Sequence, residues 1–153
     1  MLAGIAAGLF LLLAGGEVAW TRLSVRDTFR EEARRWGIPP EWPDAIVGHE
    51  SGWNASATNL TGPDAARGGA WGASQITLKT ARNYGFTGSG TDLLDPRVAA
   101  WWTMKILATV RPRSMEDAAA LWNAGRRADD PDLPEKTRTV YIPRVMAIYR
   151  AIA

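Results

Sequence analysis

Apolar positions along this chain recur mostly at intervals of three and four residues, and runs of alternating polar and apolar residues are scarce. That period is typical of amphipathic helices rather than of strands. Pro39 and Pro40 cannot continue a helix, and Gly85 and Gly125 favour the end of one. We therefore predict a mainly α-helical chain with little strand, and helices at residues 21–36, 40–50, 77–84, 95–110, 115–122 and 137–153.

The segment between residues 53 and 72 shows no apolar period and is rich in Gly, Asn, Thr and Ala. It is predicted to be a long loop, and long loops in compact domains are often functional. The helices that follow begin at typical N-cap residues, Thr77 and Ser114. Ser114 and Asp117 also have the spacing of a capping box.

The first sixteen residues, Met1 to Gly16, carry no charged side chain. This run is short for a membrane-spanning helix, which needs about 20 apolar residues, and has the length of a signal-peptide core. Val18 to Trp20 extend the run if the Glu17 side chain reaches the membrane surface. We predict a hydrophobic helix at residues 1–20 that acts as a signal or anchor segment at a membrane, with a buried core helix as the alternative.

The next helix carries arginines at four-residue spacing, which places Arg22, Arg26, Arg30 and Arg34 on one stripe. Residues 21–36 are interpreted as a helical linker whose charged stripe is solvated. The alternative is contact with lipid head groups beside a membrane anchor. Acidic residues interrupt the stripe, so nucleic-acid binding is not expected.

Composition places the 153 residues in one globular domain with an appendage. The absence of Cys excludes disulfides and thiol nucleophiles, and a single histidine, His49, cannot build a multi-histidine zinc site, so no metal site is predicted. The net charge of +2 and the pI of about 9.3 favour anionic polymers. Eight Trp suit a groove that stacks on sugar rings, although Trp101 and Trp102 follow the helical period and are expected in the core.

Glu50 stands out because it ends the predicted helix 40–50, whose Ala45, Ile46 and Val47 are apolar. The negative end of the helix dipole and burial both disfavour a charged carboxylate there and would raise its pKa. A carboxyl group that holds its proton near neutral pH can act as a general acid. The alternative is an ordinary surface glutamate at a helix end.

Four motifs occur in an order that resembles the soluble lytic transglycosylase (SLT) domain family, within the lysozyme-like superfamily. They are His49-Glu50-Ser-Gly-Trp-Asn54, Gly72-Ala-Ser-Gln75-Ile76, Trp122-Asn-Ala-Gly125 and Tyr141-Ile-Pro-Arg-Val145. Several motifs in the right order carry far more weight than one alone. The resemblance covers residues 36–153 and implies a lysozyme-like, transglycosylase-type α-helical domain at 37–153.

The resemblance implies that Glu50 is the sole catalytic carboxylate of a lytic transglycosylase that needs no cofactor. The expected reaction cleaves the β-1,4 bond between N-acetylmuramic acid and N-acetylglucosamine in peptidoglycan and leaves a 1,6-anhydromuramoyl end. A lysozyme-type peptidoglycan hydrolase, a non-catalytic glycan-binding module and a membrane protein with a passive domain remain alternatives. An exported or membrane-anchored enzyme of this kind would act in the periplasm or cell wall, and would suit a bacterial cell or a bacteriophage virion or lysis protein.

The resemblance also assigns substrate-binding roles to a set of polar and aromatic residues. Gln75 would line the groove, Asn123 would orient sugar or loop, and Asn59 falls where the family often has a sugar-contacting serine. The full set is Ser51, Asn59, Gln75, Trp122, Asn123 and Tyr141.

The sequence departs from the family pattern in four places, the first of which is Ala55 where a proline is usual. Trp122 stands where a tyrosine hydroxyl usually approaches the catalytic glutamate, so that hydrogen bond is missing or comes from Tyr141. Thr137 replaces a terminal glutamate. Extra residues between 59 and 72 include Asp64, a possible second carboxylate, for which an ion pair with Arg67 in a surface loop is the favoured interpretation over catalysis.

Overall fold

Seven α-helices and three very short strands make up residues 24–153, the part of the chain that the computed structural model describes. The predicted signal or anchor helix at 1–20 lies outside these residues. None of the described helices is long and apolar enough to cross a membrane. The helices are α1 Val25–Arg35, α2 Glu41–Ser51, α3 Gly62–Ala65, α4 Leu78–Asn83, α5 Pro96–Val110, α6 Met115–Ala124 and α7 Ile142–Ile152, with a 3₁₀ helix η1 at Gly90–Leu94 and a π-helix η2 at Thr137–Tyr141.

The mainly α-helical prediction is confirmed, and several helices begin where their capping residues indicate. The Thr77 hydroxyl accepts the Thr80 amide at 3.2 Å, and the Ser114 hydroxyl accepts the Asp117 amide at 3.1 Å. The capping box at Ser114 is only half formed, because the Asp117 carboxylate accepts the Arg113 amide at 3.1 Å. Local cap chemistry therefore fixes the starts of α4 and α6.

The long loop predicted between residues 53 and 72 is wrong in part, because this segment contains secondary structure. Strands β1 (Thr58–Asn59), β2 (Ala70–Trp71) and β3 (Ile76–Thr77) form an antiparallel sheet in the order β1-β2-β3. Thr58 pairs with Trp71, and Trp71 pairs with Ile76. Two-residue strands are too short to show an alternating pattern, which explains why the sequence gives no signal for them.

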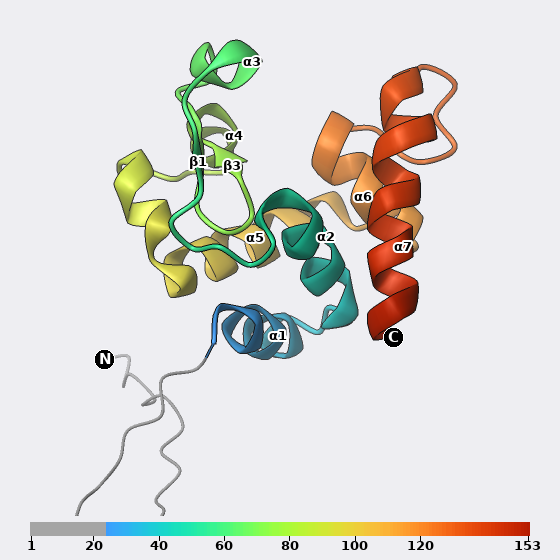
Figure 1. Cartoon of the computed structure of the whole chain (residues 1–153), viewed down its shortest axis with the longest axis horizontal. Coiled ribbons are helices and arrows are strands. Elements are labelled where there is room, and N and C mark those ends of the chain that lie inside the picture. The colour runs from blue at the N-terminus through green and yellow to red at the C-terminus, as the bar shows by residue number, and fades with distance from the viewer. Residues whose placement is uncertain (1–23) are drawn as a thin grey trace, which may run out of the picture.

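Two groups of elements flank the helix α2 (Figure 1). The strands, α3 and α4 lie on one side, and α6 and α7 lie on the other. Helix α2 packs against α7, and α1 packs against α5. The end of α2 is therefore surrounded by both groups.

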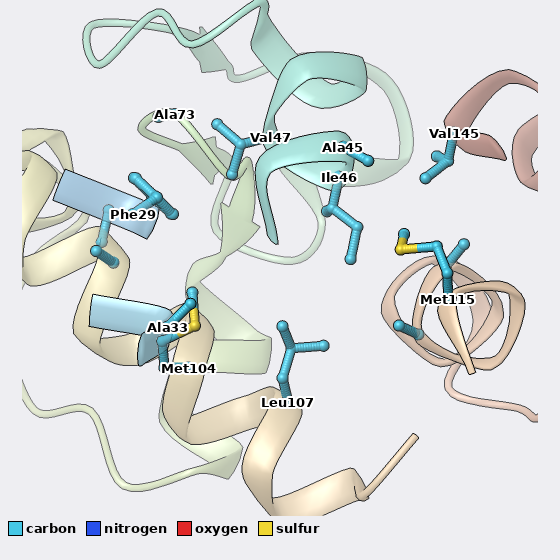
Figure 2. Packing of buried hydrophobic residues seen from close by; sticks show 14 of the residues in the cluster. Phe29, Ala33, Ala45, Ile46, Val47, Ala73, Met104, Leu107, Met115 and Val145 are labelled. Atoms are coloured by element: carbon cyan, nitrogen blue, oxygen red, sulfur yellow. The ribbon is translucent and has the colours of Figure 1, made fainter. Parts of the chain in front are cut away.

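The main hydrophobic core joins α1, α2, α5, α6 and α7 (Figure 2). Fully buried side chains from these helices include Phe29, Ala33, Ala45, Ile46, Val47, Met104, Leu107 and Val145. A smaller cluster beneath the strands contains Ile76, Ala81, Phe86, Leu93 and Ile106. The two clusters share Trp122, which packs against both.

The described part of the segment that was interpreted above as a linker contains the helix α1, whose Phe29 is fully buried in the main core. The arginine stripe is not simply solvated either. The carboxylate of Asp44 is fully buried on α2. The Nε of Arg26 donates to both of its oxygens at 2.9 Å, and a terminal nitrogen of Arg30 donates to Oδ2 at 2.6 Å. Trp53 adds an indole donor at 2.8 Å. Helix α1 is thus part of the domain core.

Trp101 is exposed rather than buried, which corrects the expectation of a core position. Helix α5 turns Ala100, Met104 and Leu107 inward, and Trp101 falls beside that stripe with 39% of its surface exposed. Its ring meets Trp102 edge-on, with centroids 4.8 Å apart. Trp102 is partly buried and packs against the smaller cluster.

Candidate active site

The carboxyl group of Glu50 is placed by the last turn of α2. The apolar residues Ala45 to Val47 bury the middle of this helix, and Gly52 ends it in a left-handed conformation with φ of 62°. The Gly52 amide donates to the Gly48 carbonyl at 3.1 Å, which is a typical helix stop. A buried helix that stops so sharply leaves Glu50 at the wall of a pocket.

That pocket has a volume of about 500 Å³ and is lined from both groups of elements. Polar and charged side chains dominate its wall, as expected for a site that binds a hydroxyl-rich ligand. Most of the site residues predicted from the sequence meet here. The lining residues are Glu50, Asn59, Asp64, Arg67, Ala70, Gln75, Ile76, Thr77, Thr80, Asn83, Tyr84, Ile106, Leu121, Trp122, Asn123 and Gly125.

The surroundings of Glu50 raise its pKa from 4.5 to about 7. Burial is the largest cause, because it disfavours the charged carboxylate. Hydrogen bonding by Tyr141 opposes the shift, the negative charge of Asp64 adds to it, and the indole of Trp122 opposes it more weakly. Glu50 therefore titrates near neutral pH, which suits a general acid that must later act as a base.

Tyr141 supplies the hydrogen bond that the family pattern assigns to a tyrosine at the position of Trp122. Its hydroxyl donates to Oε1 of Glu50. Burial, and then the charge of Glu50, raise the pKa of Tyr141 well above its ordinary value of 10, so it remains a donor. His49 packs edge-on against the Tyr141 ring, with centroids 4.7 Å apart. Tyr141 lies in the π-helix η2, and π-helical turns are frequent at functional sites.

Two backbone carbonyls, one of them in its own motif, hold the Gln75 side chain at the pocket. Its Nε2 donates to the carbonyls of Gly72 at 2.9 Å and Ala57 at 3.1 Å. Gly72 is needed for a physical reason: its φ is 72°, and a Cβ at this position would lie 2.0 Å from the carbonyl oxygen of Leu93. The motif therefore builds a tight turn that fixes the Gln75 side chain.

The remaining predicted binding residues divide between the pocket wall and its support. Asn123 lines the pocket, and its Oδ1 accepts the hydroxyl of Thr137 at 2.7 Å. Thr137, the residue that replaces the family's terminal glutamate, is thus a support for Asn123. Ser51 is not among the lining residues: its hydroxyl donates to the Ala73 carbonyl at 2.6 Å and accepts the Asn54 amide at 3.0 Å.

Asp64 does not form the expected ion pair with Arg67 in the described part of the chain. Both residues instead line the pocket. The Asp64 carboxylate accepts Nδ2 of Asn59 at 2.7 Å. The Asp64 carboxylate is thus bonded by an amide side chain instead of a guanidinium group, and sequence spacing alone cannot reveal this.

Sequence reasoning missed the pocket residues Arg67, Thr80 and Tyr84. Thr80 lies on α4 and Tyr84 caps its end, but neither belongs to one of the four motifs. The antiparallel sheet brings this helix to the pocket, and its strands gave no signal. A motif-based interpretation could therefore identify several residues of the pocket but not the contribution of α4.

Comparison with known proteins agrees with this geometry. The family model described as "Transglycosylase SLT domain" matches residues 27–136, which include most of α1. One similar structure is an inactive Glu-to-Gln mutant of the lytic transglycosylase Slt from Pseudomonas aeruginosa, at 20% identity and a TM-score of 0.57. That alignment covers 81% of this chain and 23% of the Slt chain, so the chain spans about a quarter of the Slt length.

A search of curated proteins finds no match. The similar Slt structure supports the lysozyme-like, transglycosylase-type fold predicted from the motifs. The family match covers most of the chain and includes Glu50, Gln75 and Asn123. The resemblance noted from the motifs is confirmed, and the chain belongs to the transglycosylase SLT domain family.

Proposed function

We propose that this domain is a peptidoglycan lytic transglycosylase that cleaves the β-1,4 bond between N-acetylmuramic acid and N-acetylglucosamine. The observation that carries the proposal is Glu50, a pocket carboxyl group with a pKa of about 7 and a tyrosine donor on Oε1. Membership of the family supports the substrate class. The similar Slt protein is inactive with glutamine in place of one glutamate, which is consistent with a catalytic role for a single carboxyl group.

The proposed reaction uses Glu50 twice. Its protonated form donates a proton to the glycosidic oxygen as the bond from this oxygen to the muramoyl C1 breaks. The resulting carboxylate then accepts the proton of the muramoyl C6 hydroxyl while O6 bonds to C1. Atoms balance without water, because the proton that leaves O6 replaces the one given to the departing N-acetylglucosamine. A carboxyl group with a pKa near the working pH serves both steps.

Tyr141 is proposed to keep Glu50 in one orientation through both proton transfers. Its hydroxyl stays protonated and can follow Oε1 as the charge on Glu50 changes. Gln75, which directly precedes β3, and Asn123 on α6 are proposed to position the sugars, since both line the pocket and are held by neighbouring groups. Such preorganised polar groups are a general source of catalytic rate.

A hydrolase of the lysozyme type is the second candidate, because Asp64 lines the same pocket as Glu50. Retaining glycosidases generally use a second carboxylate about 5 Å from the acid, and inverting ones place it further away to hold a water. We favour the transglycosylase because Glu50 alone has a position set by the family motifs. A non-catalytic glycan-binding module would have no need for a carboxyl group with so raised a pKa.

The experiment that tests this proposal is mass spectrometry of the fragments released from purified peptidoglycan by the full chain. A transglycosylase yields 1,6-anhydromuramoyl ends, which are lighter than reducing ends by the mass of one water. The Glu50→Gln variant should release neither product, since a general acid contributes about 10² to 10⁴ in rate. Reducing ends from the unmodified enzyme would make it a hydrolase, and undiminished release by Glu50→Gln would exclude Glu50 as the acid.

We also propose that residues 1–20 attach the enzyme to a membrane, so that it acts in the periplasm or cell wall of a bacterium or in a bacteriophage particle. The support is the uncharged run from Met1 to Gly16. Flotation with liposomes tests this: the full chain should rise with the vesicles, and a truncation that begins at Thr21 should stay behind yet remain active. Full-length protein that stays at the bottom of the gradient would contradict the proposal.

A further inference from the structure

Asp64 and Glu50 line the same pocket, although they come from different elements of the chain. Glu50 lies at the end of α2, whereas Asp64 lies in α3, between strands β1 and β2. Figure 1 shows α3 beyond the strands, at the tip of the group that faces α6 and α7. A sugar chain that fills the pocket would therefore contact a wall that contains both carboxyl groups.

The Asp64 side chain is held by its neighbours rather than carried on a free loop. Its Oδ2 accepts Nδ2 of Asn59 at 2.7 Å, and Oδ1 of Asn59 accepts the hydroxyl of Thr61 at 3.1 Å. The Asp64 carbonyl accepts the amides of Arg67 at 2.9 Å and Gly69 at 2.8 Å. These bonds fix both the backbone and the carboxylate of Asp64 at the pocket wall.

No arginine or lysine of the described residues forms an ion pair with Asp64. The two fully or nearly fully buried aspartates of the fold differ in this respect. Asp44 and Asp117 are each held by two arginines. Asp64 instead shares the pocket wall with Arg67 without an ion pair between them, so its carboxylate remains available to a ligand in the pocket.

We infer that Asp64 is a second functional carboxylate of this site, whose negative charge stabilises the positive charge that develops on the muramoyl ring while Glu50 transfers the proton. This inference rests on the proposed function. Cleavage of a glycosidic bond passes through an oxocarbenium-like transition state, and a fixed charge of opposite sign stabilises such a state without moving. Asp64 itself exchanges no proton and activates no water.

The same charge acts on Glu50 before substrate binds. The charge of Asp64 raises the pKa of Glu50, in addition to the larger effect of burial. The other titratable or charged groups that face this part of the site within residues 24–153 are Tyr141 from η2, which donates to Glu50, His49 on α2, Arg144 on α7, whose charge acts on His49, and Arg67 and Tyr84 on the pocket wall. Removing the charge of Asp64 should therefore lower the pKa of Glu50 and move the alkaline limb of the pH–rate profile to lower pH.

The test compares full-length Asp64→Asn with a matched variant, Asp132→Asn. Asp132 is 79% exposed and lies outside the pocket, so its change removes the same charge from the chain without touching the site. Initial rates of fragment release from purified peptidoglycan are measured at saturating substrate on both sides of pH 7. We expect Asp64→Asn to lower kcat about tenfold or more, a typical effect of one electrostatic group.

In addition, the alkaline limb for Asp64→Asn should move to lower pH, while both variants still form 1,6-anhydro ends. A purely structural role would lower the melting temperature without moving that limb. If the kcat and the alkaline limb of Asp64→Asn are unchanged and equal those of Asp132→Asn, the inference about Asp64 is wrong. The proposed function is not affected by that result, because it depends on Glu50. Reducing ends that disappear with Asp64→Asn would also overturn it, because Asp64 would then activate water. Undiminished lysis by Glu50→Gln would overturn both the inference and the proposed function.

Discussion

The Tyr141 hydroxyl donates to Oε1 of Glu50, although the two residues lie 91 positions apart in the chain. The contact joins η2 to the end of α2, and α7, which directly follows η2, packs along α2. A hydrogen bond to the charged form of a carboxyl group lowers its pKa, so Tyr141 limits the upward shift that burial imposes on Glu50. The position of the Tyr141 hydroxyl therefore influences the pH range over which Glu50 titrates.

Replacing Tyr141 with Phe should reduce kcat and move the alkaline limb of the pH–rate profile to higher pH. The pKa of Glu50 rises because the donor that favours its charged form is gone. The loss of a hydrogen bond to a charged group is worth about 1.5 kcal/mol, which corresponds to about tenfold in rate. The direction of the shift is opposite to that expected for Asp64→Asn. A limb that moves to lower pH would contradict the role given to Tyr141.

Glu50 should make the fold less stable as the pH rises. Its pKa is about 7 in the folded protein against an ordinary value of 4.5, so the folded state binds more protons between these values. The contribution of the protonated Glu50 to the free energy of unfolding is fully present below pH 4.5 and is lost as the pH rises through about 7. At alkaline pH, the free energy of unfolding of Glu50→Gln should therefore exceed that of the unmodified protein by about 2 kcal/mol, after allowance for partial solvent screening.

Urea unfolding at an acidic and an alkaline pH measures this difference. Glu135→Gln is the matched control, because Glu135 is exposed and makes no side-chain hydrogen bond or ion pair within residues 24–153. The gain from Glu50→Gln should be absent at the acidic pH and present at the alkaline pH. A gain that is equal at both would mean that the pKa of Glu50 is not raised in the fold.

The sequence alone identified several residues of the pocket because its information is local. Glu50, Gln75 and Asn123 each belong to a short motif, and Pro96, Thr77 and Ser114 mark helix starts by cap chemistry. Such signals depend on neighbours within a few positions. Partners across the chain, such as Tyr141 for Glu50, could be named as candidates only through the family resemblance.

The parts that sequence reasoning missed depend on tertiary packing. Helix α1 was interpreted as a linker because its surface is mostly charged, and only the buried Phe29 and Ala33 tie it to the core. Asp64 was assigned to a surface ion pair because Arg67 is three residues away, but its carboxylate accepts Nδ2 of Asn59 instead. A narrow apolar stripe and a four-residue helix are too weak as patterns to override these interpretations.

Gly72→Ala should destabilise the domain by about 3 kcal/mol. The added Cβ would lie 2.0 Å from the Leu93 carbonyl oxygen, and alanine is strained at a φ of 72°. Gly37→Ala is the matched control, because Gly37 has a similar φ of 67° but no atom within 4 Å of an added Cβ. Thermal unfolding should show about 1 kcal/mol for Gly37→Ala. Equal losses for the two variants would exclude the clash as the cause.

Asp117→Asn should cost about 3 kcal/mol of folding free energy, because it leaves two arginines without their nearly buried carboxylate. Arg113, the largest cause, together with the amide of Ala128 and Arg127, holds the pKa of Asp117 well below its usual value of 3.8. The stability from Asp117 is thus present above pH 3.8 and is lost as the pH falls below it. The free energy of unfolding of Asp117→Asn, measured with a chemical denaturant, should accordingly fall less at acidic pH than that of the unmodified protein.

Asp129→Asn provides the control for this change, since Asp129 bonds the same Arg113 at 2.7 Å but is 67% exposed. An exposed ion pair contributes little, so Asp129→Asn should destabilise the protein much less than Asp117→Asn. If Asp129→Asn proves as damaging as Asp117→Asn, the stabilisation comes from Arg113 at the surface and not from the buried carboxylate.

Arg30→Ala should destabilise the domain by about 2 kcal/mol, whereas Arg34→Ala should stay within about 0.5 kcal/mol. Both arginines belong to the same stripe of α1, one turn apart, so the two changes have similar effects on helix propensity. They differ in their partners. Arg30 donates at 2.6 Å to Asp44, whose carboxylate is fully buried on the helix that carries Glu50, and Arg34 forms no ion pair within residues 24–153. Urea unfolding of both variants measures the difference. Equal, small losses would mean that the contact of Arg30 with Asp44 adds little to that of Arg26, which bonds the same carboxylate at 2.9 Å.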